Sequence, residues 1–329
     1  MLYLIHLFYI KEGMYMELRQ LEYFMMLCRE LHFTRAAEKL NISQPTLSHQ
    51  IKVLENEVGV PLFDRLGKKI AITDAGAILF EQCVHIFHAL DNTRDQINDL
   101  KSLKAGNLVI GTLPGELTNL VSEQLLSYHY QYPDIQVSIS SSDNLLSLLK
   151  DNKVDFAITY TKEHFDYEEE QLVKIPLFTE ELLVVAHTSH PILSTETVQF
   201  KDVLQYPLIL FPTMQQCRKV IDGAARNENL QVTPKLETAS TNAIFTFVEQ
   251  NVGATIISKS LYDLHKTDSI CARSICNPPL TREIILLYRK DKFINFCAKA
   301  FIQLFIDGLA NMGMYVPEKS LHDMRTLLT

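Results

Sequence analysis

The periodicity of apolar residues changes once along this chain of 329 residues, near Gly106. Before that point apolar residues recur every three or four positions, which is the spacing of an amphipathic helix. After it, short apolar runs alternate with helical stretches, and this alternation is typical of α/β sheets with parallel strands. The chain therefore combines a helical N-terminal part with an α/β C-terminal part, and its length indicates two or three domains.

The composition is that of a globular protein. Hydrophobic residues make up 47% and charged residues 21% of the chain, which argues against global disorder. The six cysteines include no Cys-x-x-Cys pair, and the eleven histidines show no metal-binding spacing. No apolar run reaches the length of a membrane span. We therefore expect no disulfide framework, no metal, no cofactor and no membrane partner.

Residues 1–10 are apolar and could be taken for a secretory signal. No positive charge precedes them, however, and no small-residue cleavage site follows. Lys11-Glu12-Gly13 would be encoded by purine-rich codons that resemble a ribosome-binding site just upstream of Met16. We therefore interpret residues 1–15 as a leader produced by a wrongly assigned start codon, with translation beginning at Met16.

The N-terminal part predicts three short helices. Apolar residues of the first helix recur at three- and four-residue steps. Thr34 is a candidate N-cap of a second helix, and Ser43 is a candidate N-cap of a third helix with Pro45 in its first turn. The small pair Ala36-Ala37 would let these two helices approach each other closely.

Two further elements are expected before the change in periodicity. Residues 60–73 contain Pro61, Gly67 and an alternating apolar pattern, which predicts a small hairpin or wing. From residue 74 to about residue 104 an apolar stripe continues at helical spacing, which predicts one long helix. The stripe could pack on its own domain or on a partner.

The third helix and the wing have the character of a DNA-binding surface. Neither residues 43–52 nor residues 65–73 contain an acidic residue, although the whole chain has a formal charge of -8. In helix-turn-helix proteins the N-terminal part of such a helix enters the major groove, where Gln and Ser can contact base edges and Lys suits phosphates. The candidate DNA-contacting residues are Thr34, Ser43, Gln44, Pro45, Thr46, Ser48, His49, Lys52, Arg65, Lys68 and Lys69.

The segment from Met16 to Gly76 resembles the DNA-binding domain of LysR-type transcriptional regulators. The motifs that carry the resemblance are Phe33-Thr-x-Ala-Ala37, Ser43-Gln-Pro-x-Leu-Ser48, Gln50-Ile51, Leu54-Glu55, Gly59, Leu62-Phe63-x-Arg65 and Thr73-x-Ala-Gly76. The resemblance implies a winged helix-turn-helix at residues 16–73, with the helix-turn-helix at about 33–52, and a linker and dimerisation helix at 74–104. It also implies a cytoplasmic homodimer or homotetramer that reads a partly symmetric site in double-stranded promoter DNA, with RNA polymerase as a further candidate partner.

The α/β remainder is similar to the effector domain of the same family, which has a periplasmic-binding-protein-like fold of two α/β lobes. The resemblance implies an effector-binding domain at residues 107–312 whose lobes are joined by two crossing strands. Lobe I would comprise about 107–178 and 280–312, lobe II about 179–279, and residues 313–329 a C-terminal tail. The expected fold class is thus α+β multidomain, with a winged helix-turn-helix, a long linker helix and a two-lobed effector domain.

A small-molecule effector is expected between the lobes, because open α/β sheets bind ligands at the carboxyl ends of strands, near loops and helix N-termini. The strand that ends at Phe211-Pro212-Thr213 is expected to be one of the crossing strands. Hydroxyls at helix N-termini would suit a small carboxylate or another metabolite, although any of them could be a simple N-cap. The candidate effector-binding residues are Thr112, Pro114, Gly115, Ser141, Ser142, Thr213, Arg218, Ser240 and Thr241.

Two alternatives to a ligand-responsive transcription factor are open. The first is an enzyme or a transport-type binding protein on the same two-lobed fold, but we find no nucleophile motif, no Gly-rich phosphate loop and no paired acids with a role, and expect no catalytic residue. The second is a redox sensor, because Cys217 lies in a loop where peroxide-sensing relatives keep a reactive cysteine. The next cysteine is Cys271, which is far from the short spacing that a resolving partner needs.

Overall fold

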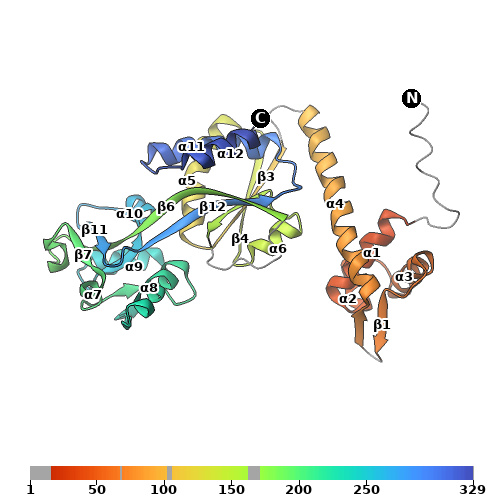
Figure 1. The fold of residues 1–329 in the computed structure, drawn as a ribbon, viewed down its shortest axis with the longest axis horizontal. Helices are drawn as coiled ribbons and strands as arrows, with labels where there is room; N and C mark the ends of the chain where they lie inside the picture. Colours follow the sequence, from red (N-terminus) through yellow and green to blue (C-terminus); the bar gives the residue numbers. More distant parts are fainter. Residues whose placement is uncertain (1–15, 67–68, 102–105, 162–170, 329) are drawn as a thin grey trace. The chain divides into compact units, whose positions relative to one another are not determined.

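The structure is a computed structural model that describes residues 16–66, 69–101, 106–161 and 171–328 (Figure 1). The chain divides into two compact units, Met1–Arg94 and Asp95–Thr329. The division falls inside helix α4 (Asp74–Lys101). The leader expected at residues 1–15 lies outside the described residues. Across the described ranges, no helix combines the length and the apolar character needed to cross a membrane.

Three helices enclose one apolar core in the N-terminal unit. They are α1 (Leu18–Glu30), α2 (Phe33–Lys39) and α3 (Gln44–Val58). Ala36 and Ala37 of α2 are at most 2% exposed, which is the close approach that small residues allow. Ser43 is the N-cap of α3, since its Oγ accepts a hydrogen bond from the Thr46 backbone N–H at 3.2 Å. The helix ends at Gly59 with a φ of 82°, a left-handed conformation that glycine adopts readily.

Helix α2 begins earlier than predicted. We expected Thr34 to be its N-cap, but the N-cap is His32, whose ring Nδ1 accepts a hydrogen bond from the Arg35 backbone N–H at 3.4 Å. Phe33 is therefore the first helical residue, and its half-buried ring packs against the apolar core. The prediction was wrong because a histidine nitrogen takes the place of the hydroxyl that N-cap preferences favour.

An antiparallel hairpin follows α3 and leads into α4. Its strands are β1 (Phe63–Leu66) and β2 (Lys69–Ile72). Thr73 joins the hairpin to α4, because its Oγ1 donates to the Pro61 carbonyl at 2.9 Å and accepts from the Gly76 N–H at 3.0 Å. One hydroxyl thus caps α4 and holds the base of the hairpin.

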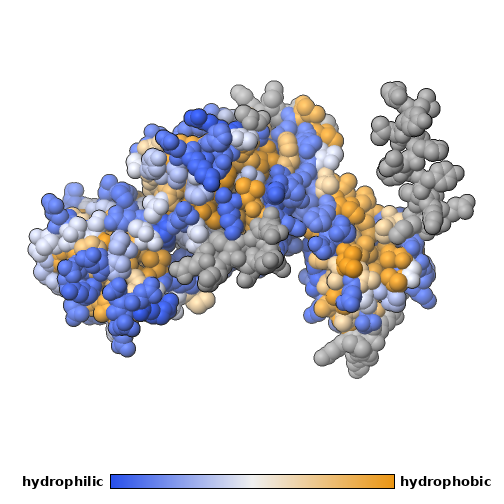
Figure 2. Space-filling view, viewed as in Figure 1, coloured by the Kyte–Doolittle hydropathy of each residue, from blue (hydrophilic) through white to orange (hydrophobic). Residues whose placement is uncertain are grey.

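The apolar residues of α4 lie in two environments. Cys83 is fully buried, and Leu79 and Val84 pack against the core of the N-terminal unit. Ile78 and Leu90 are 65% and 43% exposed, and hydrophobic surface gathers over the N-terminal unit along α4 (Figure 2). The predicted stripe is therefore divided between internal packing and a surface that is open in a single chain.

The first lobe of the C-terminal unit is an α/β layer structure with its own apolar core. Its parallel strands β4, β3 and β5 are continued by β12 and the first part of β6, which are antiparallel to each other. Residues of four helices complete the core. The elements are β3 (Gly106–Thr112), α5 (Glu116–Gln131), β4 (Ile135–Ser141), α6 (Leu145–Lys150), β5 (Phe156–Tyr160), β12 (Thr281–Arg289), α11 (Phe296–Asn311) and α12 (Glu318–Leu328).

The second lobe has a separate apolar core. The last part of β6 pairs with β10 and β11, β7 pairs with β11, and β8 pairs with β9. The elements are β6 (Leu172–His187), the 3₁₀ helix η3 (Pro191–Ser194), β7 (Thr197–Gln199), α7 (Phe200–Val203), β8 (Ile209–Leu210), α8 (Gln216–Asn227), β9 (Leu236–Glu237), α9 (Thr241–Glu249), β10 (Thr255–Ser258), α10 (Lys259–His265) and β11 (Ile270–Cys276).

The strands that connect the lobes are β6 and β12, which run side by side (Figure 1). We expected the strand ending at Phe211 to cross between the lobes, and this was wrong. That strand is β8, which has two residues and pairs with β9 inside the second lobe. Strand β6 is long enough to belong to both cores. It has 16 residues, of which residues 172–181 run along β12, with an irregularity at Leu177, and residues 182–187 pair with β10 and β11.

The segment expected as a C-terminal tail contains a helix. Helix α12 occupies most of residues 313–329, and Met324 on it is 1% exposed. Val316, just before the helix, is 7% exposed and belongs to the same core as the first-lobe sheet. These buried side chains attach the segment to the first lobe.

Candidate functional site

Helix α3 presents one polar face and buries the other. Leu47, Ile51 and Leu54 are at most 1% exposed and hold the helix against the core. The remaining side chains of residues 43–52 are mostly polar, and none of them is acidic. Ser43, Gln44, Pro45, Thr46, His49 and Lys52 are exposed and Ser48 is half-buried. Such a face at the N-terminal end of a helix can meet base edges in a major groove.

The basic residues predicted for the wing are close together along the hairpin backbone. Arg65 lies in β1 opposite Ile70, and Lys69 lies in β2 opposite Leu66, so both belong to strands that meet at the hairpin turn. Lys68 lies outside the described residues. Thr34 is exposed in the first turn of α2.

Glu55 connects α3 to the hairpin. Its Oε1 accepts hydrogen bonds from the backbone N–H groups of Leu62 and Phe63, at 2.9 and 3.2 Å. The carboxylate therefore holds the start of β1 against α3. The position of the hairpin relative to α3 is fixed in this way. The sequence indicated Glu55 only as part of the Leu54-Glu55 motif. Its hydrogen bonds to Leu62 and Phe63 could not be predicted, because no local sequence pattern marks a carboxylate whose partners are seven and eight residues away.

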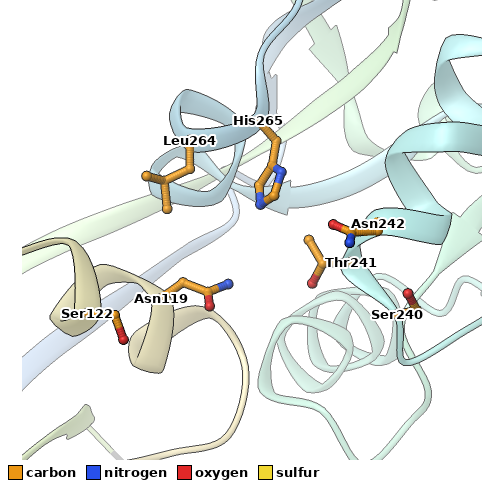
Figure 3. Close-up of a pocket in the computed structure, with 7 residues that line it drawn as sticks. All are labelled: Asn119, Ser122, Ser240, Thr241, Asn242, Leu264 and His265. Atoms are coloured by element: carbon orange, nitrogen blue, oxygen red, sulfur yellow. The ribbon is translucent and has the colours of Figure 1, made fainter.

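A cavity of about 500 Å³ opens between the two lobes of the C-terminal unit (Figure 3). It is lined from α5 of the first lobe and from the start of α9 and the end of α10 in the second lobe. Hydroxyls and amides predominate among the lining side chains, which also include the imidazole of His265. The lining residues are Asn119, Ser122, Ser240, Thr241, Asn242, Leu264 and His265.

Two of the predicted effector-binding residues, Ser240 and Thr241, line this cavity. Ser240 is also the N-cap of α9, because its Oγ accepts a hydrogen bond from the Ala243 N–H at 3.3 Å. The two roles are compatible, since the cap leaves the first N–H groups of a nine-residue helix directed toward the same end. A helix N-terminus carries partial positive charge, which favours an anionic group nearby.

Thr112, Ser141 and Ser142 form a hydroxyl cluster at the carboxyl ends of β3 and β4. Thr118 Oγ1 is 2.8 Å from Thr112 Oγ1 and 3.3 Å from Ser141 Oγ. The Ser142 backbone N–H donates to the Thr112 carbonyl at 3.0 Å, and Ser142 Oγ accepts from the Asn144 N–H at 3.1 Å. Thr118 precedes the lining residue Asn119 on α5, whereas Thr112, Ser141 and Ser142 themselves do not line the cavity.

Two predicted loops approach each other from opposite lobes. Gly115 precedes α5 with a φ of 98°, and a Cβ built on it would lie 3.9 Å from Gln215 Oε1 of the second lobe. Pro114, next to Gly115, and Thr213, two residues before Gln215, are exposed. Both loops follow strands in the sequence. The expectation that ligand contacts lie in such loops therefore identified residues on both lobes.

Arg218 is buried in an ion-pair cluster of the second lobe. Its guanidinium donates to Asp222 Oδ1 at 2.8 Å, to Glu237 Oε2 at 3.1 Å and to the Phe211 carbonyl at 3.2 Å. The cavity is lined by other residues, so these three acceptors account for the position of Arg218. Cys217 beside it is 2% exposed, and a buried thiol of this kind is usually inert.

The lining residues that sequence reasoning missed are Asn119, Ser122, Leu264 and His265. Asn119 and Ser122 lie one helical turn apart on α5, beyond the loop where ligand contacts were expected. His265 ends α10, and its ring stacks on Phe245 with the centroids 4.7 Å apart. A small-polar pair at i, i+3 on a helix is too common to have indicated a cavity.

Comparison with known proteins identifies both parts of the chain. The family model described as "Bacterial regulatory helix-turn-helix protein, lysR family" matches residues 18–77, and the one described as "LysR substrate binding domain" matches residues 101–310. Together these cover the winged helix-turn-helix and the two-lobed unit.

Similar full-length proteins give the same result. The chain is 28% identical over 292 residues to the HTH-type transcriptional activator CmpR of Synechocystis, covering 87% of this chain and 93% of that protein. It is 29% identical over 298 residues to the HTH-type transcriptional regulator BsdA of Bacillus subtilis, covering 88% and 100%. The fold matches full-length OxyR of Pseudomonas aeruginosa with a TM-score of 0.62 at 23% identity, over 90% and 95% of the two chains. The chain belongs to the LysR family of DNA-binding transcriptional regulators, with an N-terminal helix-turn-helix domain and a two-lobed effector-binding domain.

Proposed function

We propose that this regulator reads its operator with the exposed face of α3, while basic residues of the wing contact the phosphates. The observation that carries the proposal is the acid-free, hydrogen-bonding face from Ser43 to Lys52, which is held over a fully buried apolar side of the same helix. Glu55 supports the proposal further, because it ties the wing to this helix. Preference for the upstream intergenic region over a scrambled duplex in a gel shift tests it.

Gln44→Ala is expected to weaken operator discrimination by roughly 1–3 kcal/mol, because an amide near the start of a recognition helix reads a base edge. Asn56→Ala is the matched control, since it removes an exposed amide near the other end of the same helix. Gel-shift titrations on operator and on random duplex measure the ratio of affinities. An equal loss on both duplexes for Gln44→Ala would refute base readout by this residue.

We propose that two or four copies assemble through α4. Ile86, Leu90 and Ile97 are 38%, 43% and 46% exposed, and their four- and seven-residue spacing suits the seam of paired helices. Two DNA-binding units would then face the two halves of a partly symmetric operator. RNA polymerase is a further candidate partner of such a promoter-bound assembly.

We propose that a small carboxylate or another small metabolite occupies the cavity between the lobes. Support comes from the hydroxyl and amide lining, from the N-terminus of α9 and from His265. An effector would shift the balance between lobe arrangements by its differential affinity for them.

Thr241→Val is expected to weaken effector binding about tenfold, because it removes a lining hydroxyl while keeping the shape of the side chain. The effector is first identified by a thermal-shift screen of small carboxylates, amino acids and aromatic acids. Ser142→Ala is the comparison variant, since Ser142 lies at the strand ends and does not line the cavity. Calorimetric titration of the screened compound into both variants separates the two positions, and a larger loss in Ser142→Ala would place the effector at the strand ends instead.

A further inference from the structure

The last two turns of α4 belong to the effector-binding unit rather than to the DNA-binding unit. The boundary between the compact units lies between Arg94 and Asp95, although the helix continues without a break to Lys101. Its final turns must therefore have contacts of their own with the C-terminal unit. Two carboxylates one turn apart on α4, Asp95 and Asp99, make those contacts.

Asp95 forms an ion pair with a lysine that is almost completely buried. Lys292 Nζ lies 3.3 Å from Asp95 Oδ2 and 2.9 Å from Asp155 Oδ1, and only 5% of the lysine side chain is exposed. Asp155 is itself anchored in the first-lobe sheet, because its Oδ2 accepts a hydrogen bond from the Val109 N–H at 2.8 Å. A single ammonium group thus bridges the linker helix and the sheet of the first lobe.

Asp99 makes the second contact. Its Oδ2 accepts a hydrogen bond from the backbone N–H of Phe296, at 2.9 Å. Phe296 is the first residue of α11, so the carboxylate lies at the N-terminus of a 16-residue helix, where negative charge is stabilised. Asp99, Asp155 and Asp95 all act on the neighbouring Cys297. Burial and the negative charges of these three residues together raise the pKa of the Cys297 thiol to about 11.

The same group of residues continues to the crossing strand β12. Arg289, the last residue of β12, is 4% exposed, and its guanidinium donates to Asn152 Oδ1 at 3.1 Å. Lys292 Nζ donates to the same oxygen at 3.2 Å. A continuous polar network therefore runs from the end of a strand that connects the lobes to the end of the linker helix.

We propose that Asp95 and Asp99 of α4, together with Lys292 and the N-terminus of α11, form a latch that couples the effector domain to the DNA-binding domain. This inference rests on the proposed function. The latch holds the last turns of α4 to the first lobe, and through Asn152 it is linked to β12, one of the two strands that join the lobes. Lys292 is a positioning residue in this device, since it balances two carboxylates that would otherwise repel each other.

Hydrogen–deuterium exchange of the full-length protein tests the latch directly. Lys292→Met keeps the aliphatic stem but removes the charge, and the amides of residues 96–101 should then exchange at least about tenfold faster. Lys299→Met, the same substitution on α11, is the control and should leave those amides unchanged. Asp95→Asn and Asp99→Asn provide a second route if Lys292→Met does not fold. Unchanged exchange at 96–101 in every folded variant would overturn the latch.

A second measurement tests the coupling. Saturating wild-type protein with a duplex of the upstream intergenic region should slow exchange in residues 289–296, and the Asp95→Asn, Asp99→Asn double variant should lose at least about nine-tenths of that change. An equal change in both proteins, or none in the wild type despite DNA binding, would refute the coupling. Failure of the wild type to bind the duplex would instead reject the proposed function, together with the coupling role, while the exchange of the free protein would still report on the latch contacts.

Discussion

Arg282→Met is expected to lower the free energy of unfolding of the effector-binding unit by about 3–5 kcal/mol, because it leaves a carboxylate buried without its counter-charge. Arg282 and Glu180 face each other on the two crossing strands, with Nη2 and Nε at 2.7 and 2.9 Å from Glu180 Oε2. Their side chains are 5% and 2% exposed. Charges so far from water interact strongly, and removing one partner costs more than a surface pair ever contributes.

The surroundings of the pair explain why the site cannot relax. The Arg282 guanidinium lies 4.0 Å from the centre of the Tyr160 ring, at the end of β5, and the Ser260 hydroxyl of α10 donates to Glu180. Tyr160 belongs to the first lobe and Ser260 to the second, so the pair is enclosed from both sides where the lobes join. In the Arg282→Met variant, water would therefore have little access to the Glu180 carboxylate.

Urea unfolding followed by circular dichroism measures the loss, with hydrogen exchange used to assign the transition of the effector-binding unit. Lys259→Met is the control, because the Lys259–Asp263 pair is 2.6 Å long but its lysine side chain is 49% exposed, and it should cost less than about 1 kcal/mol. Replacing both buried charges in Glu180→Leu, Arg282→Met should recover most of the loss. Equal effects of Arg282→Met and Lys259→Met would contradict this account.

Gly76→Ala is expected to destabilise the DNA-binding unit by about 2 kcal/mol or more, through a steric clash. A Cβ on Gly76 would lie 2.3 Å from the Leu62 carbonyl oxygen and 2.7 Å from Ile72 Cγ1. Alanine normally stabilises a helix interior over glycine by about 1 kcal/mol, so the expected sign is opposite to that of helix propensity. The clash is with backbone at the base of the hairpin, so relief would separate the wing from α4 and weaken DNA binding as well.

Gly59→Ala is the matched control for this prediction. Gly59 has a φ of 82°, and a Cβ added there would have nothing within 4 Å, so the cost of the substitution is backbone strain alone, about 1 kcal/mol. Thermal unfolding of Gly76→Ala and Gly59→Ala, with gel-shift affinity as the second readout, distinguishes the cost of the steric clash from the cost of backbone strain. A Gly76→Ala protein as stable as wild type would show that the hairpin base can move without cost.

Local features of the DNA-binding unit were predictable from sequence. The Ser43 cap, the Pro45 position and the Gly59 stop depend on residues within a few positions, and the structure has all three. The start of α2 was missed because His32 caps it, which N-cap preferences do not anticipate. The role of Glu55 was missed because its partners come from the next element.

Strands of the effector-binding unit were harder to predict than its helices. Strand β11 has Arg273 and Ser274 in its centre and lacks an apolar run, yet it forms because β6 and β7 pair with it on either side. The uninterrupted apolar run of β6 covers only its second half, since Pro176 and charged residues interrupt the first half. Pairing with neighbours, rather than the pattern within the strand, decides both cases.

The family, the order of the domains and the candidate DNA-contacting face of α3 follow from the sequence by itself, because each depends on short-range periodicity, capping and closely spaced motifs. The tertiary structure alone decided where the lobes cross, which side chains line the cavity and how α4 is attached to the first lobe. Asn119 and His265, or Asp95 and Lys292, are far apart in sequence and have no local pattern in common. Only folding brings such groups together, because burial and charge pairing reward contacts regardless of their separation along the chain.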